Sequence, residues 1–255
     1  MWQAMTVTAR RSSPMVNTFI QSMPPGPRAR LLAHCTPARL VFGDLLCDLG
    51  KPIRHVHFPL TGFISLVVTV NGHRPLEMGM IGNEGMLGAT LALGIGAAPL
   101  QAVVQGGGSA LRMPAAQFRL QLRESPQLQR MVNRYLYVLI EHLTQTAACN
   151  SFHEVPARLA RWLLMTHDRA HSDRFQLTHL YLAGMLGVRR SAVTIAAGEL
   201  QRRQLIRYTR GKITVLSRSG LEGACCKCYA AGLDTYDRRL PVSWKMQTQN
   251  RSRPG

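Results

Sequence analysis

The sequence predicts an α+β protein in which a β-roll of the jelly-roll type, a long helix and a winged helix-turn-helix follow one another along the chain. Short apolar runs separated by Gly-rich turns occupy residues 36–120, and an uninterrupted helical pattern begins at Ser125. Residues 177–200 then show the small-residue spacing of a helix-turn-helix. A chain of 255 residues is long enough for two domains with cores of their own.

The β-roll is predicted from four short strands. Asn71-Gly72 is a hairpin turn signal, and Gly-rich segments separate the later runs. The expected strands are Phe63–Val70, Leu76–Ile81, Ala102–Gln105 and Ala110–Met113. No charged residue occurs between Gly85 and Leu111, but repeated Gly and Pro in that stretch favour buried strands and turns over a membrane span.

The long helix is predicted to begin at Ser125-Pro126, with Ser as the N-cap and Pro as the first helical residue, and to reach Cys149. Alternating spacings of four and three give an imperfect heptad seam through Leu128, Val132, Tyr135 and Leu139. We expect this seam to form a homodimer contact, the alternative being a helix packed on its own barrel.

The helix-turn-helix is predicted from Ala183, Gly187 and Val193, which stand four and six residues apart. A small residue is needed where the two helices cross, a Gly in the turn, and a β-branched residue where the second helix packs back. A preceding helix is expected over Val155–Thr166, and a hairpin follows, Leu205–Tyr208 and Lys212–Leu216 joined by Thr209-Arg210-Gly211.

The exposed residues around this motif are typical of a DNA reader. Arg190 is suited to a bidentate contact with guanine, and its neighbours start the second helix, whose first turn enters the major groove. The hairpin would be a wing along the DNA backbone. The expected DNA-contacting residues are Thr178, Arg189, Arg190, Ser191, Thr194, Arg202, Arg203, Arg207, Arg210 and Lys212.

The charge distribution agrees with a nucleic-acid partner. The net charge is +18, and residues 151–230 hold 13 basic and 5 acidic side chains. Such a field attracts polyanions. An RNA binder or a nonspecific polyanion binder therefore remains an alternative.

Over about residues 31–230 the chain resembles the cyclic-AMP receptor protein / fumarate-nitrate reductase regulator (Crp/Fnr) family of transcriptional regulators. The resemblance is carried by SPQLQRMVNRYLYVLIEHL, VPARLARWLL, the helix-turn-helix and LQRRQLIRYTRGKITVLSRSGLE. It implies a homodimer that binds palindromic double-stranded DNA, with RNA polymerase as the expected partner. Arg190 matches the family's base-contacting arginine, whereas Ser191 and Ile195 replace an acidic and a basic residue, so a different half-site is expected.

The cyclic-nucleotide-binding-like sensor departs further from the family pattern. Nucleotide binders carry Gly-Glu and then Arg-Ser or Arg-Thr, but here Gly82-Asn83-Glu84-Gly85 is followed by no Arg before Arg112. A buried cyclic phosphate would lack its countercharge. Cys35 and Cys47 are too few for a family-type iron-sulfur site. We therefore expect a degenerate sensor with no cofactor and an effector that the sequence does not identify.

An enzyme is the alternative from another class. Gly50, His55 and His57 are similar to the metal motif of cupins, which would make the chain a cupin-like metalloenzyme with an appended basic domain. No Glu follows at the required spacing, and no GxSxG, Walker or GxGxxG motif is present. We expect no catalytic and no metal residues.

Cys225, Cys226 and Cys228 are the only cysteine cluster in the sequence. No second CxxC pair completes a zinc site, so a thiol switch or a soft-metal contact is left open.

The expected organisation is 1–30 a disordered arm, 31–124 the β-roll sensor, 125–150 the dimerisation helix, 151–230 the winged helix-turn-helix DNA-binding domain, and 231–255 a basic tail. The cysteine spacing shows no disulfide framework and no signal peptide is evident, which favours a cytoplasmic protein without a membrane segment.

Overall fold

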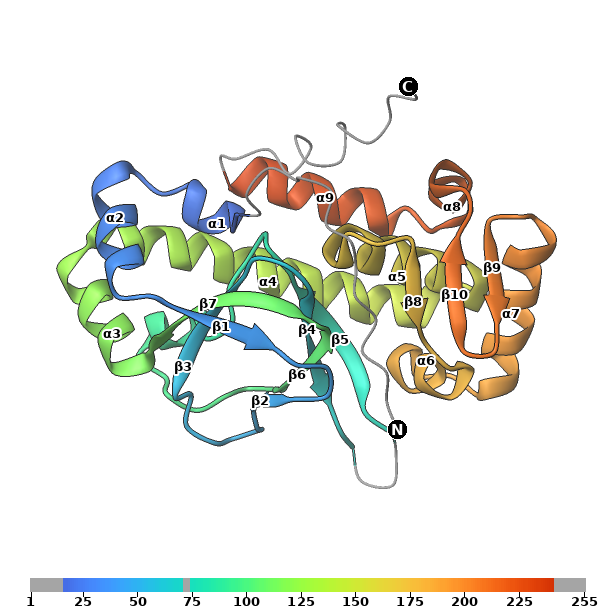
Figure 1. Ribbon diagram of the computed structural model, residues 1–255, viewed down its shortest axis with the longest axis horizontal. Coiled ribbons are helices and arrows are strands. Elements are labelled where there is room, and N and C mark those ends of the chain that lie inside the picture. The colour runs from blue at the N-terminus through green and yellow to red at the C-terminus, as the bar shows by residue number, and fades with distance from the viewer. Residues whose placement is uncertain (1–15, 71–73, 241–255) are drawn as a thin grey trace.

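A long central helix, α4 (Pro126–Phe152), organises the molecule. In the computed structural model, which describes residues 16–70 and 74–240, the β-roll lies along one half of this helix and the helix-turn-helix domain lies at its other end (Figure 1). The α+β class and the order of the three parts agree with the prediction.

Two antiparallel sheets form the β-roll. One has the order β1-β7-β3 and the other β2-β6-β4-β5, with β4 hydrogen bonded to both β5 and β6. The strands are β1 (Thr36–Leu40), β2 (Leu45–Cys47), β3 (His55–Pro59), β4 (Phe63–Val68), β5 (Leu76–Ile81), β6 (Gln101–Gly106) and β7 (Gly108–Pro114). The four strands expected from the sequence are confirmed, with differences of one or two residues at their ends.

Two short helical elements complete this half, the 3₁₀ helix η1 (Ala89–Leu93) and α3 (Ala115–Glu124). The expectation that strands extend to residue 120 was wrong, because Pro114 precedes a helix whose Phe118 is fully buried.

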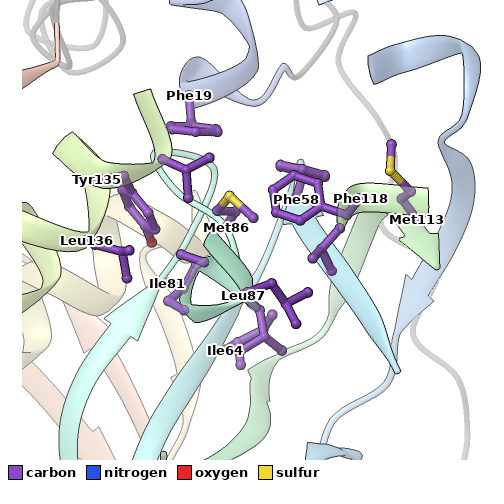
Figure 2. Close-up of a cluster of buried hydrophobic side chains, with 14 of the residues drawn as sticks. Phe19, Phe58, Ile64, Ile81, Met86, Leu87, Met113, Phe118, Tyr135 and Leu136 are labelled. Atoms are coloured by element: carbon purple, nitrogen blue, oxygen red, sulfur yellow. The ribbon is translucent and has the colours of Figure 1, made fainter. Parts of the chain in front are cut away.

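The N-terminal segment is part of the fold. Residues 16–30, expected to belong to a disordered arm, contain α1 (Thr18–Gln21) and most of α2 (Pro25–Ala33). Phe19 is 1% exposed and packs against Tyr135 of α4 with ring centroids 5.3 Å apart (Figure 2). The arm prediction was wrong for these residues because their apolar side chains cover the junction of the roll and α4; residues 1–15 lie outside the described residues.

The start of α4 is confirmed, since the Ser125 hydroxyl accepts a hydrogen bond from the Leu128 backbone N–H. The expected dimer seam is wrong. Leu128, Val132 and Tyr135 are 1%, 0% and 0% exposed, and Leu139 packs partly buried against the same core. This stripe faces the protein's own β-roll, because it is the most apolar face of the helix and the roll offers it a large apolar surface.

The C-terminal half consists of a compact helical unit with a three-stranded sheet of order β8-β10-β9. Its elements are α5 (Val155–Ala170), β8 (Arg174–Gln176), α6 (His179–Leu186), α7 (Arg190–Arg202), β9 (Ile206–Thr209), β10 (Lys212–Val215) and α8 (Arg218–Ala224). The expected helix-turn-helix and hairpin are both present; β8 was not expected, since three residues carry almost no periodic signal.

A last helix, α9 (Cys228–Arg239), lies along α4 (Figure 1). Tyr236 is 5% exposed and its ring meets that of His142 at 4.8 Å. The prediction of a free basic tail from residue 231 was wrong for residues 231–239, which pack through this face; residues 241–255 lie outside the described residues.

The two halves share a core. Phe63, Val67 and Met80 from the roll belong to the same buried cluster as α5, α6 and α7. Among the described residues, no helix has the length and apolar character needed to cross a membrane.

Candidate nucleic-acid interface

The turn between α6 and α7 has the geometry that the sequence pattern predicts. Gly187 ends α6 with a φ of 62°, and the Val188 backbone N–H donates to the Ala183 carbonyl at 3.0 Å. Ala183 and Val193 are 5% and 0% exposed. The motif therefore holds α7 rigidly against the domain core.

All ten residues expected to contact DNA are exposed, on the start of α6, on α7 and on the β9–β10 hairpin. Thr178 caps α6 by accepting a hydrogen bond from the Tyr181 N–H at 3.1 Å. Arg189 is the N-cap of α7 and Arg190 its first residue. Arg189 and Ser191 also line a groove of about 850 Å³, whose opposite wall includes Arg74 and Leu76 of the roll.

Thr194 is held in place by its neighbours. Its hydroxyl lies 3.1 Å from the Arg190 carbonyl and 2.9 Å from His179 Nδ1, and the His179 ring stacks on Tyr208 with centroids 4.1 Å apart. This chain of contacts ties the recognition helix to α6 and the hairpin.

Ile195 is a surface residue that the sequence reasoning did not place in the site. It is 71% exposed one turn into α7, although the other large apolar side chains of this helix are buried. Ile195 stands where the family has a basic residue, and this difference was the signal in the sequence that the position belongs to the site.

The hairpin has a two-residue turn. Thr209 pairs with Lys212, and Arg210 and Gly211 have φ values of 48° and 78°. Positive φ at both central positions is the type I′ arrangement, which normally favours Asn-Gly. An Arg in this strained position presents its guanidinium at the tip of the wing.

Most of the arginine and lysine side chains expected to contact DNA are available to bind a polyanion. Arg203 has an acidic neighbour, Glu199, at 3.8 Å, and both side chains are substantially exposed. Such a surface pair is weak and leaves the arginine available.

Residues 157–224 match the family model described as the Crp-like helix-turn-helix domain. This segment is similar to the Crp-like helix-turn-helix domain family. The match covers α5 to α8, including the turn and the wing whose geometry is given above.

About three quarters of the chain is similar in fold to solved Crp/Fnr-type regulators, which confirms the predicted resemblance and fold class. FixK2 from Bradyrhizobium japonicum has a TM-score of 0.62 and 14% identity, covering 75% of this chain and 98% of its own. The c-di-GMP-responsive global regulator CLP of Xanthomonas campestris has a TM-score of 0.61 and 16% identity, and the match covers 76% of this chain and 100% of CLP. A CRP/FNR-family regulator from Thermus thermophilus has a TM-score of 0.60 and 20% identity, and the match covers 74% of this chain and 97% of that regulator. No curated protein matches the sequence.

The β-roll half of the chain contains a cavity of about 410 Å³ between the roll and α4. Leu66, Ile81 and Leu136 are among its lining residues, and none of the lining side chains carries a charge. A cavity of this size accommodates a small ligand, and its chemistry suits an apolar one.

Glu84, in the segment expected to correspond to the nucleotide-gripping loop, does not line this cavity. Its carboxylate pairs with Arg169 of α5 at 2.8 Å, and the two side chains are 2% and 4% exposed. A side chain at Gly82 would meet Arg169 Cγ at 2.6 Å, so glycine permits this close approach. The loop thereby connects the β-roll to the helix-turn-helix domain through α5.

The strand histidines give no support to a cupin-type metal centre. His57 is 7% exposed, and burial lowers its pKa to about 4. Within residues 16–70 and 74–240, neither His55 nor His57 belongs to a group of three or more metal-ligating side chains.

A different cluster does bring such side chains together. Cys149, His153, Cys226 and Cys228 place their ligand atoms within 4.8 Å of one another. Only Cys226 and Cys228 stand close enough in the sequence to be recognised together, because Cys149 and His153 lie more than 70 residues earlier. Cys225, the remaining member of the predicted cysteine cluster, is not in this group.

Proposed function

We propose that the chain is a transcription regulator that binds palindromic DNA sequence-specifically as a homodimer. The observation that carries this proposal is an exposed Arg190 at the start of a helix fixed by a complete helix-turn-helix core. A bidentate arginine–guanine contact is worth about 1–3 kcal/mol of discrimination against other bases.

The other exposed residues of this surface are suited to two kinds of contact, with bases and with phosphates. Ile195 is suited to apolar contact with a thymine methyl group, whereas Arg207, Arg210 and Lys212 of the wing are suited to phosphates. Arg202 and Arg203, at the end of α7, extend this phosphate-binding surface.

The dimer contact is proposed on the most exposed stripe of α4, whose Asn133, Tyr137 and Ile140 also line the edge of the cavity between the roll and α4. This face, here termed the outer seam, has alternating spacings of four and three, and Tyr137 and Ile140 at its centre are 46% and 60% exposed. The outer seam consists of the exposed residues Asn133, Tyr137, Ile140, Thr144 and Ala147. Its period is the one expected from the sequence, shifted to a neighbouring face of the helix.

The sensor is proposed to be degenerate with respect to cyclic nucleotides. Its cavity has no cation to neutralise a phosphate, and Glu84 is engaged by Arg169. An uncharged apolar effector fits the lining better. RNA polymerase is the expected partner once the protein is bound to DNA.

Selection of duplexes from a random pool by the full-length protein tests the proposal. We expect a palindromic consensus, and we expect Arg190→Ala to lose preference at one base pair in each half-site. Arg123→Ala, which removes an exposed arginine from α3, is the matched control and should leave the consensus unchanged.

Equal retention of scrambled duplexes by the wild type would favour a nonspecific polyanion binder instead. A consensus that Arg190→Ala and Arg123→Ala alter equally would contradict the role given to Arg190.

A further inference from the structure

A compact set of four metal-ligating side chains lies where α4 ends and α9 begins. Cys149 and His153 are four residues apart at the C-terminal end of α4, with His153 as the C-cap, so they lie on one face. Cys226 and Cys228 come from the connection between α8 and α9 and from the first residue of α9. Two segments separated by more than 70 residues therefore meet at one point.

The separations of the ligand atoms match a single tetrahedral ion. Cys149 Sγ lies 3.5 Å from Cys226 Sγ, and Cys228 Sγ lies 3.4 Å from His153 Nδ1. Zinc–sulfur bonds of about 2.3 Å imply a ligand–ligand edge of roughly 3.8 Å in a tetrahedron. The ligand atoms are 3.4 and 3.5 Å apart in these two pairs and no more than 4.8 Å apart in any pair, so the separations bracket the ideal edge. Small side-chain rotations therefore close the site.

Burial also separates these cysteines from ordinary surface thiols. Cys149, Cys226 and Cys228 are 1%, 7% and 3% exposed and form a small cluster of their own, apart from the two main cores. Three thiols gathered in this way satisfy one another poorly as hydrogen-bonding groups, whereas a metal ion satisfies all of them.

We propose that Cys149, His153, Cys226 and Cys228 bind one zinc ion in a closed Cys₃His site. Zinc is favoured because three thiolates and one imidazole form a recurrent tetrahedral structural set. Each thiol loses its proton to solvent on binding, and no electron transfer is involved.

Surrounding residues fit the charge of such a site. Three thiolates and a neutral imidazole around Zn²⁺ carry a net charge of −1, and Arg158 and Arg161 lie close enough to Cys149 to interact with it electrostatically. The Gln145 side-chain amide donates to Cys228 Sγ at 2.8 Å, a second-sphere contact of the kind that orients thiolate ligands.

The geometry argues against a [4Fe–4S] cluster. In that cluster each cysteine ligates a different iron, which requires the cysteine sulfur atoms to stand farther apart than around one ion.

Metal analysis of the full-length protein, prepared under reducing conditions and without a histidine tag, tests the proposal. We expect about one zinc per chain. Cys149→Ser, Cys226→Ser and His153→Ala should each reduce the content at least tenfold. Cys225→Ser is the matched control: this cysteine neighbours Cys226 but lies outside the ligand set, so its removal should leave the zinc content unchanged.

A second readout does not depend on the stability of the cysteine variants. Metal-free wild type titrated with Co²⁺ should develop thiolate-to-cobalt charge-transfer bands and the intense visible bands of a tetrahedral ion, saturating at one equivalent. His153→Ala changes the most exposed ligand of the four and should fold normally while losing the tetrahedral spectrum.

Three results would overturn the proposal. They are zinc binding that is equal in Cys225→Ser and Cys149→Ser, iron with inorganic sulfide in the purified protein, and a Cys149–Cys226 disulfide in a chain that takes up no cobalt after reduction.

Discussion

Ile195 shows how a single side chain can point to function when its burial contradicts its type. The apolar pattern of α7 predicts which residues face the core, and Val193, Ala196 and Leu200 are indeed buried. The same pattern cannot explain an isoleucine that is 71% exposed beside Arg190. From the sequence, Ile195 was expected only to change the half-site and was not counted among the DNA-contacting residues, since an apolar residue in a helix is normally assigned to packing.

We expect Ile195→Ala to reduce affinity for the selected consensus by about 1 kcal/mol or more while leaving binding to scrambled DNA unchanged. Fluorescence anisotropy measures both. If the isoleucine contacts a thymine methyl, replacing that thymine by uracil should weaken the wild type and have no further effect on Ile195→Ala. Additive effects of the two changes would contradict the contact.

Arg210 combines backbone strain with charge. An L-residue with a φ of 48° costs roughly 1 kcal/mol relative to residues that favour this region. Arg210→Asn should therefore raise the free energy of unfolding by about 0.5–1 kcal/mol, measured by urea denaturation. It should also weaken DNA binding and lower the slope of log affinity against log salt by about two, because each subunit of the proposed homodimer loses one phosphate contact.

Arg210→Lys separates the two effects, because it retains the charge and the strain. It should leave both measurements close to the wild type. An unchanged salt slope in Arg210→Asn would place the guanidinium away from the DNA backbone.

At the scale of the element, α4 serves two surfaces at once. Its N-cap and Pro start were predictable because they depend on local chemistry alone. Which face is available for the proposed dimer contact was not predictable, because two stripes of the helix share the same alternation of four and three. The more apolar stripe through Leu128 and Tyr135 is buried by the β-roll and α1, which only the tertiary structure reveals.

The outer seam leads to a prediction about assembly. Ile140→Glu should convert a dimer into a monomer at micromolar concentration, because it would bring a carboxylate from each subunit into an apolar contact. Light scattering coupled to size-exclusion chromatography measures the mass. Leu120→Glu alters an exposed leucine on α3 and should remain dimeric. A dimer that survives Ile140→Glu would place the interface elsewhere.

At the scale of the whole molecule, the β-roll and the Crp-like domain are joined by buried polar contacts as well as by a shared core. The order of the domains was predictable from periodicity. The structured parts of the supposed arm and tail were not, since Phe19 and Tyr236 become buried only against segments distant in sequence.

The Glu84–Arg169 pair is expected to be sensitive to removal of one partner. Glu84→Gln leaves a buried guanidinium without its countercharge, which should lower the free energy of unfolding by about 3–5 kcal/mol. Denaturation by urea measures this loss. The double variant Glu84→Gln with Arg169→Met should recover much of it, and an equally unstable double variant would show that packing rather than charge is responsible.

Glu77 of β5 should make stability depend on pH. It accepts hydrogen bonds from Trp162 of α5 at 2.8 Å and from Ser65, yet burial raises its pKa from 4.5 to about 7. The folded state therefore holds this proton more tightly than the unfolded state, so its contribution to stability is greatest below pH 4.5 and declines as the pH rises through 7. Relative to wild type, Glu77→Gln should gain stability between about pH 5 and 8 in urea denaturation. Parallel pH profiles would contradict the shift.

The shared core sets a threshold for any effector. Turning the Crp-like domain away from the roll would expose part of Phe63, Val67 and Met80, which are 2–3% exposed in the present arrangement. Exposing about half of these side chains costs roughly 2–4 kcal/mol. A ligand can supply that work only by preferring the rearranged form by about 30- to 1,000-fold in affinity. Metabolites that bind the two forms with similar affinity would occupy the cavity without changing the arrangement of the two halves.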